Sequence, residues 1–276
     1  PAAVPALIEA LKDKDRIVRM YAASVLRNIG PADKDAVPAL IGALKDKEPG
    51  VRIQAASALA RVDPTVKAAV PALIEVFKDK DPDVRFEAAL ALGEIGPTAM
   101  SALTVALKDN DPKARMGAAF ALERMGPAAK DAVPDLIKAL KDKDSDVRSS
   151  AAYVLGEISP AAKDVVPALI RALKDTSILV RSSAASALGV ISTAASDTVP
   201  ALIGALKDKY SSVRYSASTA LSKIGYAALP ALIVALKDKD TRVRSGAASA
   251  LKAMRMNDPD ARVRKAAVEA LKSIAK

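Results

Sequence analysis

The chain has 276 residues, of which 51% are hydrophobic but only 3% aromatic, and it carries a net charge of +10 at pH 7. It contains no Cys, His or Trp, so it cannot build disulfides, thiolate metal sites, Cys nucleophiles or Ser-His-Asp triads. No run of 18 consecutive apolar residues is present, and we expect no membrane-spanning helix. The positive charge is unevenly placed, because residues 234–276 hold 11 Lys and Arg against 5 Asp and Glu.

An arginine that mostly follows valine recurs along the whole chain and defines a repeat. It occupies positions Arg19, Arg52, Arg85, Arg115, Arg148, Arg181, Arg214, Arg244 and Arg264, with steps of 33, 33, 30, 33, 33, 33, 30 and 20 residues. A period near 33 with two helical patterns per unit predicts an all-α fold, an α-solenoid of about eight helix pairs. We expect a single domain over residues 1–276, with repeats near 1–30, 31–63, 64–96, 97–126, 127–159, 160–192, 193–225 and 226–256 and a C-terminal cap helix at 257–276.

The first helix of each unit reads like "VPALIEALKD" at residues 4–13. A proline stands near its start, where the first-turn N–H groups have no helical partner and a missing N–H costs little. These prolines are Pro5, Pro38, Pro71, Pro134, Pro167, Pro200 and Pro230.

The second helix follows "KDKD" or a close variant. An aspartate four residues before the arginine is placed to cap the helix by accepting hydrogen bonds from first-turn N–H groups. These aspartates are Asp15, Asp81, Asp111, Asp144 and Asp240. The stripe Val147, Ala151, Leu155 and Ile158 has helical spacing and is the expected core face, and "GP" at 30–31, 96–97 and 126–127 is expected to end the helix.

Two charged patterns in the repeat have a structural and a chemical interpretation. The alternating aspartates at 142–146 resemble the start of a calcium loop, but Val147 and Tyr153 stand where such a loop needs glycine and glutamate, so capping is favoured and we expect no metal site. The recurring arginines are interpreted as a structural ladder between repeats, with a row of phosphate-binding groups as the alternative. Their expected partners are Asp13, Asp46, Asp79, Asp109, Asp142, Asp175, Asp208 and Asp238.

Two repeats are three residues short, at "GPTAMSAL" (96–103) and "GYAALPAL" (225–232). They lie 129 residues apart, which indicates a duplicated block of four repeats. Each short junction is expected to change the stacking of the repeats locally.

The repeated string "DAVPALIGALKDKEPGVRIQAASALARV" resembles the HEAT-like repeats of the phycobilisome-lyase type, and the resemblance covers essentially the whole chain. It implies that the second helix of each pair lines a concave surface. The chain is also similar to the consensus repeats of engineered HEAT-like binders, so a natural and a designed origin both stay open.

The second helices vary most at positions one, two and five residues after the arginine, where five of the eight aromatic residues fall. Spaced about 8–10 Å apart per helix, the apolar side chains at these positions would form a track about 30 Å long. We call this set the apolar track: Met20, Tyr21, Ile53, Phe86, Leu90, Met116, Phe120, Tyr153 and Tyr215. One interpretation is a partner-binding surface, and the other is that these side chains fill gaps between adjacent helices.

The leading hypothesis is a non-enzymatic scaffold that binds a protein or peptide on the apolar track, with charged side chains around it. This polar rim comprises Arg27, Arg61, Glu87, Glu94, Glu123, Arg124 and Glu157. The alternatives are nucleic-acid binding, favoured by the pI of 9.6 but disfavoured by mixed charges, and a phycobilin-lyase-like chromophore chaperone. We expect no cofactor, a monomer and a cytoplasmic location.

Overall fold

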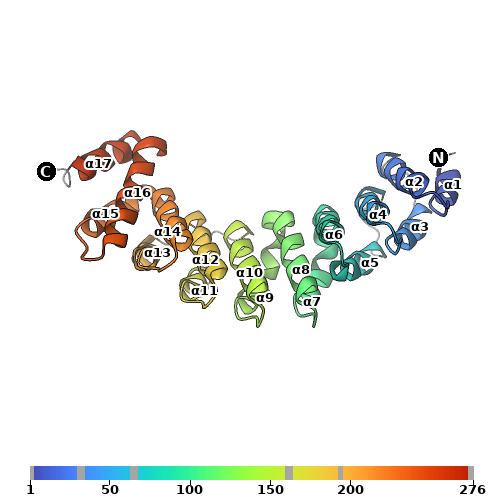
Figure 1. Ribbon diagram of the computed structural model, residues 1–276, viewed down its shortest axis with the longest axis horizontal. Coiled ribbons are helices and arrows are strands. Elements are labelled where there is room, and N and C mark those ends of the chain that lie inside the picture. Colours follow the sequence, from blue (N-terminus) through green and yellow to red (C-terminus); the bar gives the residue numbers. More distant parts are fainter. Residues whose placement is uncertain (1–2, 30–34, 63–67, 159–163, 192–194, 273–276) are drawn as a thin grey trace. The chain divides into compact units, whose positions relative to one another are not determined.

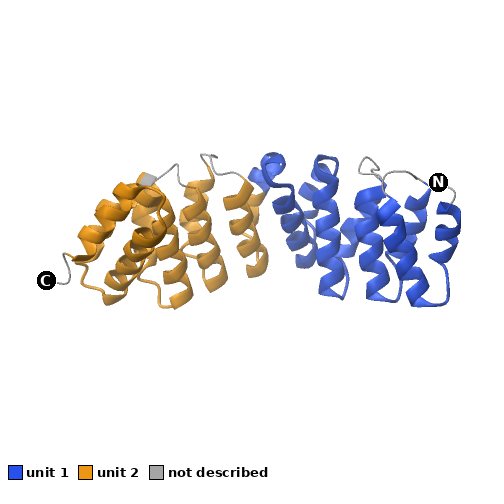
Figure 2. Cartoon of the chain, turned by 90° about the horizontal axis from the view of Figure 1, so that it is seen from above, with its two compact units in different colours: residues 1–135 blue, residues 136–276 orange. Residues whose placement is uncertain are grey.

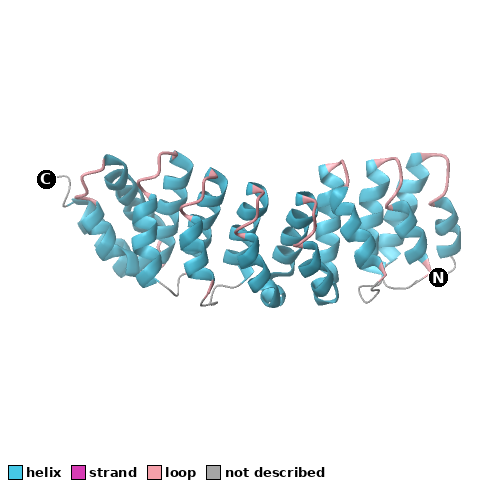
Figure 3. Cartoon of the chain, turned by 90° about the horizontal axis from the view of Figure 1, so that it is seen from below, coloured by secondary structure: helices cyan, strands magenta, loops and turns pink. Residues whose placement is uncertain are grey.

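The computed structural model describes residues 3–29, 35–62, 68–158, 164–191 and 195–272, and helices are the regular secondary structure of these ranges. Figure 1 shows the helices in chain order, and short loops join them (Figure 3). The contacts group the chain into two compact units, Pro1–Asp135 and Leu136–Lys276 (Figure 2). The all-α solenoid predicted from the repeats is confirmed, whereas the single domain over residues 1–276 stays a prediction.

The first helices of the repeats are short and carry their proline in the first turn in most cases. They are α1 (Val4–Ala10), α3 (Ala36–Ala43), α5 (Ala69–Glu75), α7 (Met100–Ala106), α9 (Val133–Ala139), α11 (Val165–Ala172), α13 (Ala195–Ala205) and α15 (Leu229–Ala235). The prediction that Pro200 begins a helix is wrong, because α13 extends five residues further toward the N-terminus and Pro200 lies inside it.

The second helices are longer, and five of them, α2, α6, α8, α10 and α16, begin directly after an expected aspartate. They are α2 (Arg16–Ile29), α4 (Pro49–Val62), α6 (Pro82–Ile95), α8 (Pro112–Met125), α10 (Ser145–Ile158), α12 (Ile178–Val190), α14 (Ser211–Ile224) and α16 (Thr241–Asn257). The carboxylates of Asp15, Asp81, Asp111, Asp144 and Asp240 each accept a hydrogen bond from the backbone N–H two residues later. These caps, and the burial of Val147, Ala151, Leu155 and Ile158, are therefore confirmed.

Each unit consists of two layers of helices. In unit 1 the first helices α1, α3, α5 and α7 pack in sequence, and the second helices α2, α4, α6 and α8 pack beside them in a layer of their own (Figure 1). In unit 2 the second helices α10, α12, α14 and α16 pack in the same way, and α17 (Ala261–Lys272) packs on α16 at the position predicted for the cap helix.

Glycine brings neighbouring second helices close together at one repeat position. A Cβ atom added to Gly156 would lie 2.7 Å from the Cβ of Ala187, and one added to Gly189 would lie 2.6 Å from the Cα of Ala220. A larger side chain at either position would push the two helices apart, so the spacing within unit 2 depends on these glycines.

Among the described residues, three junctions between repeats turn at a glycine with positive φ. Gly96, Gly126 and Gly225 have φ values of 68°, 59° and 68°, a conformation that other residues rarely adopt. Each begins a 3₁₀ segment: η2 (Gly96–Ala99), η3 (Gly126–Ala132) and η5 (Gly225–Ala228). The predicted helix ends at 96–97 and 126–127 are thus confirmed, whereas 30–31 and the repeat boundaries near 63, 159 and 192 lie outside the described residues.

Within the part of the chain that the structure describes, two stretches, Pro82–Ala106 and Ser211–Ala235, are long and apolar enough to cross a membrane by length and composition, with a mean hydropathy of 1.3 each. Each consists of a second helix, a 3₁₀ segment and the next first helix, and the chain turns at Gly96 or Gly225 between them. Core helices of a solenoid pass the same test because their stacked faces are apolar. The absence of a membrane-spanning helix stays a prediction.

Candidate interaction surface

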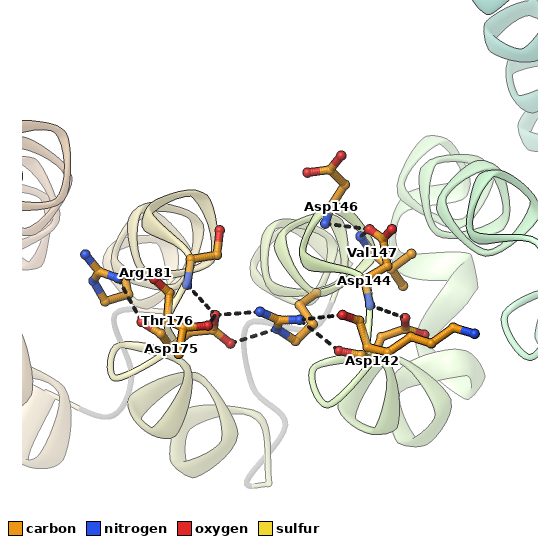
Figure 4. A network of polar contacts seen from close by, with 10 residues as sticks. Asp142, Asp144, Asp146, Val147, Asp175, Thr176 and Arg181 are labelled. Atoms are coloured by element: carbon orange, nitrogen blue, oxygen red, sulfur yellow. Dashed lines mark hydrogen bonds and ion pairs between the residues drawn. The ribbon is translucent and has the colours of Figure 1, made fainter.

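The recurring arginines hold adjacent repeats together through aspartates 27 residues further along the chain. Arg19 Nε donates to Asp46 Oδ2 at 2.6 Å and Nη2 donates to Oδ1 at 3.0 Å, while Nη1 donates to the backbone carbonyls of Asp13 and Lys14. The pairs Arg148–Asp175 and Arg181–Asp208 repeat this geometry in unit 2, and Figure 4 shows the Asp175 region. In these three pairs the arginine has the structural role that the repeat pattern predicts for it.

Arg52 forms the same ladder contact with a small difference in alignment. Its Nη2 donates to Asp79 Oδ1 at 2.8 Å, whereas Nε lies 2.7 Å from Oδ2 without the direction of a hydrogen bond. The contact is an ion pair between two largely buried side chains.

Each ladder aspartate also shapes the turn that precedes the next second helix. The N–H of Glu48 donates to Asp46 Oδ1, and that of Ser177 donates to Asp175 Oδ1, each two residues along the chain. Hydrogen bonds from Arg19 hold the pKa of Asp46 below its usual value of 3.8, and those from Arg148 do the same for Asp175. One carboxylate therefore fixes both a local turn and the contact between repeats.

The ladder changes at the two short repeats, where the arginine and the aspartate are no longer matched. The Nη1 of Arg85 and of Arg214 donates to backbone carbonyls, and among the described residues neither guanidinium contacts a carboxylate. Asp109 lies 3.1 Å from Lys78 instead, and Asp238 lies 3.9 Å from Lys207. The predicted ladder partners are thus wrong at Arg85 and Arg214, because the loss of three residues moves the aspartate to another cation.

Arg115 and Arg244, the other two predicted ladder arginines, make the same local contacts. Arg115 Nη1 donates to the carbonyls of Asp109 and Asn110, and Arg244 Nη1 donates to those of Asp238 and Lys239.

In unit 1 the apolar track lies on the second helices and none of its members belongs to the buried core. Tyr21 on α2 is 62% exposed and Phe86 on α6 is 50% exposed, while Met20, Ile53, Leu90, Met116 and Phe120 are half-buried. The rings of Phe86 and Phe120 stack at a tilt with their centroids 5.0 Å apart. The structure therefore brings α6 and α8 together at an aromatic pair, of which Phe86 is exposed and Phe120 is half-buried.

In unit 2 the same positions are mostly polar. Tyr153 on α10 and Tyr215 on α14 are exposed, and they stand apart from each other in a face otherwise lined by serine and threonine. The hydroxyls of Ser149 and Ser183 lie 3.0 Å apart and link α10 to α12.

The predicted polar rim contains exposed and half-buried side chains. Arg61 lies 3.8 Å from Glu94, and Arg27 Nη1 donates to Ser57 Oγ at 3.5 Å, so these contacts connect successive second helices. Arg124 and Glu157 are exposed, and Glu87 and Glu123 are half-buried. In the described ranges no group of three acidic side chains is placed to hold a metal ion.

Sequence reasoning missed a second apolar surface on the first helices of unit 1. A groove of about 700 Å³ between α5 and α7 is lined in part by Val70, Ile74 and Val105, and Val105 is 69% exposed. It lies beside the short junction at Gly96, whose shortened linker was the available signal. Tyr226, in the equivalent short junction of unit 2, is 70% exposed and was also missed.

Models of HEAT repeats match nearly the whole sequence. One matches residues 4–69, 51–123, 100–189, 134–222 and 166–252, and a second matches residues 253–276. No curated protein matches the chain. Among solved structures, the crystal structure of an engineered protein is similar, with 25% sequence identity and a TM-score of 0.51 over 99% of this chain and 89% of that one.

Proposed function

The chain belongs to the HEAT repeat family, and from this premise we propose that it is a non-enzymatic scaffold that binds a protein or peptide on the apolar track. HEAT repeats in general mediate contacts between proteins. The likeness to an engineered protein agrees with a designed origin. The phycobilisome-lyase type, a concave binding face, a monomeric state and a cytoplasmic location stay predictions.

The aromatic pair on α6 and α8 carries the proposal. Half of the surface of Phe86 stays exposed although its ring stacks on Phe120, so this contact alone does not bury the side chain. A partner that covers such a side chain gains about 1.5–3 kcal/mol for each, before the cost of association. Tyr21 extends the apolar surface of unit 1 on α2.

The charges around the track favour a protein partner over a nucleic acid. Arg61 is paired with Glu94, and Glu87 stands directly beside Phe86 in the chain, so the surface is mixed rather than uniformly basic. A nucleic-acid groove needs a run of unopposed cations along the backbone path. The chromophore-chaperone alternative has no feature of the described residues in its favour.

The experiment is affinity capture from lysate with the full chain and with Phe86, Met116 and Phe120 replaced by serine. The matched control is Val105→Ser, because Val105 is an exposed apolar residue on the other helix layer. The proposal expects the triple variant to lose the captured protein while the control keeps it and both stay helical by circular dichroism. Equal capture by both variants contradicts it, and loss by the control alone moves the site to the groove between α5 and α7.

A further inference from the structure

A groove of about 420 Å³ lies between α14 and α16 in unit 2, and seven of its eight lining residues carry a polar or charged side chain. It is formed by Arg214 and Tyr215 of α14 and by Thr241, Ser245 and Ser249 of α16, among others. Its volume falls in the range of sites that bind small groups or side chains.

Arg214 presents an edge of its guanidinium that is occupied in the matched repeats. In Arg181 the Nε and Nη2 atoms donate to the two oxygens of Asp208, whereas in Arg214 only Nη1 has partners among the described residues, the carbonyls of Asp208 and Lys209. The groove lies between α14 and the next second helix, which is the side from which the carboxylate arrives at Arg181. The neighbouring repeat thus shows that this edge of the guanidinium binds a carboxylate.

The charge of Arg214 is not balanced by the acids around it. Asp208 pairs with Arg181, Asp238 lies near Lys207, and Asp240 is held by Arg242 at 2.6 Å. Ser245 and Ser249 lie one turn apart on α16 and are exposed, so their hydroxyls can donate to an anion in the groove. Tyr215 is 74% exposed and offers an aromatic face at the same place.

Unit 1 carries different side chains at the equivalent positions. The polar groove is therefore not a general property of the two short repeats. Arg85 stands 129 residues before Arg214 and likewise lacks a carboxylate among the described residues. The positions of Tyr215, Ser245 and Ser249 are filled there by Phe86, Met116 and Phe120, and the two rings stack on each other.

We propose that the groove between α14 and α16 binds a single anionic group of a peptide, a phosphate monoester or a carboxylate, on the free edge of Arg214 with Ser245 and Ser249 as further donors. A peptide fits better than a nucleic acid, because the groove offers one unopposed guanidinium rather than a path of several. The site goes beyond the proposed function, since it lies in unit 2 and its anion donors Arg214, Ser245 and Ser249 are not members of the apolar track, although Tyr215 of the track lies in its lining.

The test is a titration of the full-length protein, ¹⁵N-labelled at arginine, with three capped pentapeptides that carry phosphoserine, glutamate or serine at the centre. The proposal expects a saturable shift of the Arg214 Nε–H resonance with the first or second peptide, and binding of the serine peptide weaker by at least about tenfold. The stronger of the two anionic peptides identifies the ligand. A short single-stranded oligonucleotide that shifts the resonance at lower concentration than both peptides overturns the proposal.

Two variants, one of them with a matched control, test which residues of the groove bind the peptide. Arg214→Gln removes the anchor, and its control Arg85→Gln removes the equivalent arginine beside the filled position. The double variant Ser245→Met with Ser249→Phe keeps Arg214 but copies the filling of unit 1, and it should weaken the anionic peptide by at least about tenfold. Equal shifts at Arg85 and Arg214, no shift at millimolar peptide, or unchanged binding after filling each rejects the site.

Discussion

Arg181 grips both carboxylate oxygens of Asp208, at 2.6 Å and 3.1 Å, across the contact between two successive repeats. Both side chains are largely buried, at 10% and 13% exposure. The two residues lie 27 positions apart in the sequence, so the contact joins repeats that the chain alone would leave independent.

Arg181→Ala should lower the free energy of unfolding by about 2–3 kcal/mol, because it leaves the Asp208 carboxylate without its charged donor. Urea unfolding measures this loss. Arg214→Ala is the control, since it removes contacts to carbonyls only and should cost less. A coupling energy near zero in the double-mutant cycle of Arg181→Ala and Asp208→Ala would contradict the ladder.

Acid should destabilise the protein through the ladder aspartates Asp46 and Asp175 and through the capping aspartate Asp240. The pKa values of Asp46 and Asp175 are lowered in the folded state by their arginines, and the pKa of Asp240 is lowered to about 2 by Arg242. The unfolded chain then binds more protons than the folded one, so this stability is present above pH 3.8 and is lost as the pH falls toward 2.

Urea unfolding at a series of pH values between 6 and 2, in steps of about half a pH unit, measures this loss of stability. The double variant Asp46→Asn with Asp175→Asn keeps an acceptor for the turn but no charge, and its profile should be flatter. A parallel profile would show that other groups cause the loss.

Gly156→Ala should destabilise unit 2 by about 1–3 kcal/mol, because the new Cβ would lie 2.7 Å from that of Ala187. Gly42→Ala is the matched control, since Gly42 is also helical but has nothing within 4 Å of its added Cβ. That control should gain up to about 1 kcal/mol from helix propensity. Thermal unfolding compares the two, and a gain in both would show that α10 and α12 are less tightly packed.

Replacing Phe86 and Phe120 by alanine, singly and together, should reveal a coupling of about 0.5–1.5 kcal/mol in stability from the stacked rings. The helical content should stay unchanged, because Phe86 is half exposed and Phe120 half-buried outside the core. Circular dichroism and urea unfolding supply both readouts. Global unfolding of the double variant would assign the two rings to the core instead.

Features that depend on a few neighbouring residues could be predicted from the sequence. The Asp144 cap and the Val147 core stripe follow from helix geometry alone, and both are confirmed. Ladder partners could be predicted only where the repeat length is constant, so Arg85 and Arg214 were misassigned.

Burial of the aromatic residues was harder to predict, because it depends on what the next repeat places opposite each ring. Phe77 is fully buried, and Gly117 on α8 leaves the space for it, since an added Cβ there would lie 2.6 Å from its ring. Phe86, on the second helix of the same repeat, stays half exposed. The sequence placed Phe86 on the apolar track but could not measure the space that faces either ring.

The change of ladder partner at the short repeats also predicts the order in which the repeats should unfold. Where arginine binds aspartate in two places, adjacent repeats melt as one cooperative block, whereas the lysine contacts at Asp109 and Asp238 are weaker couplings. In unit 2, the segment from α15 to α17 should therefore exchange its amide hydrogens before the pair α12 and α14. We therefore expect the length of a repeat to determine the order of partial unfolding as well as the stacking of the helices.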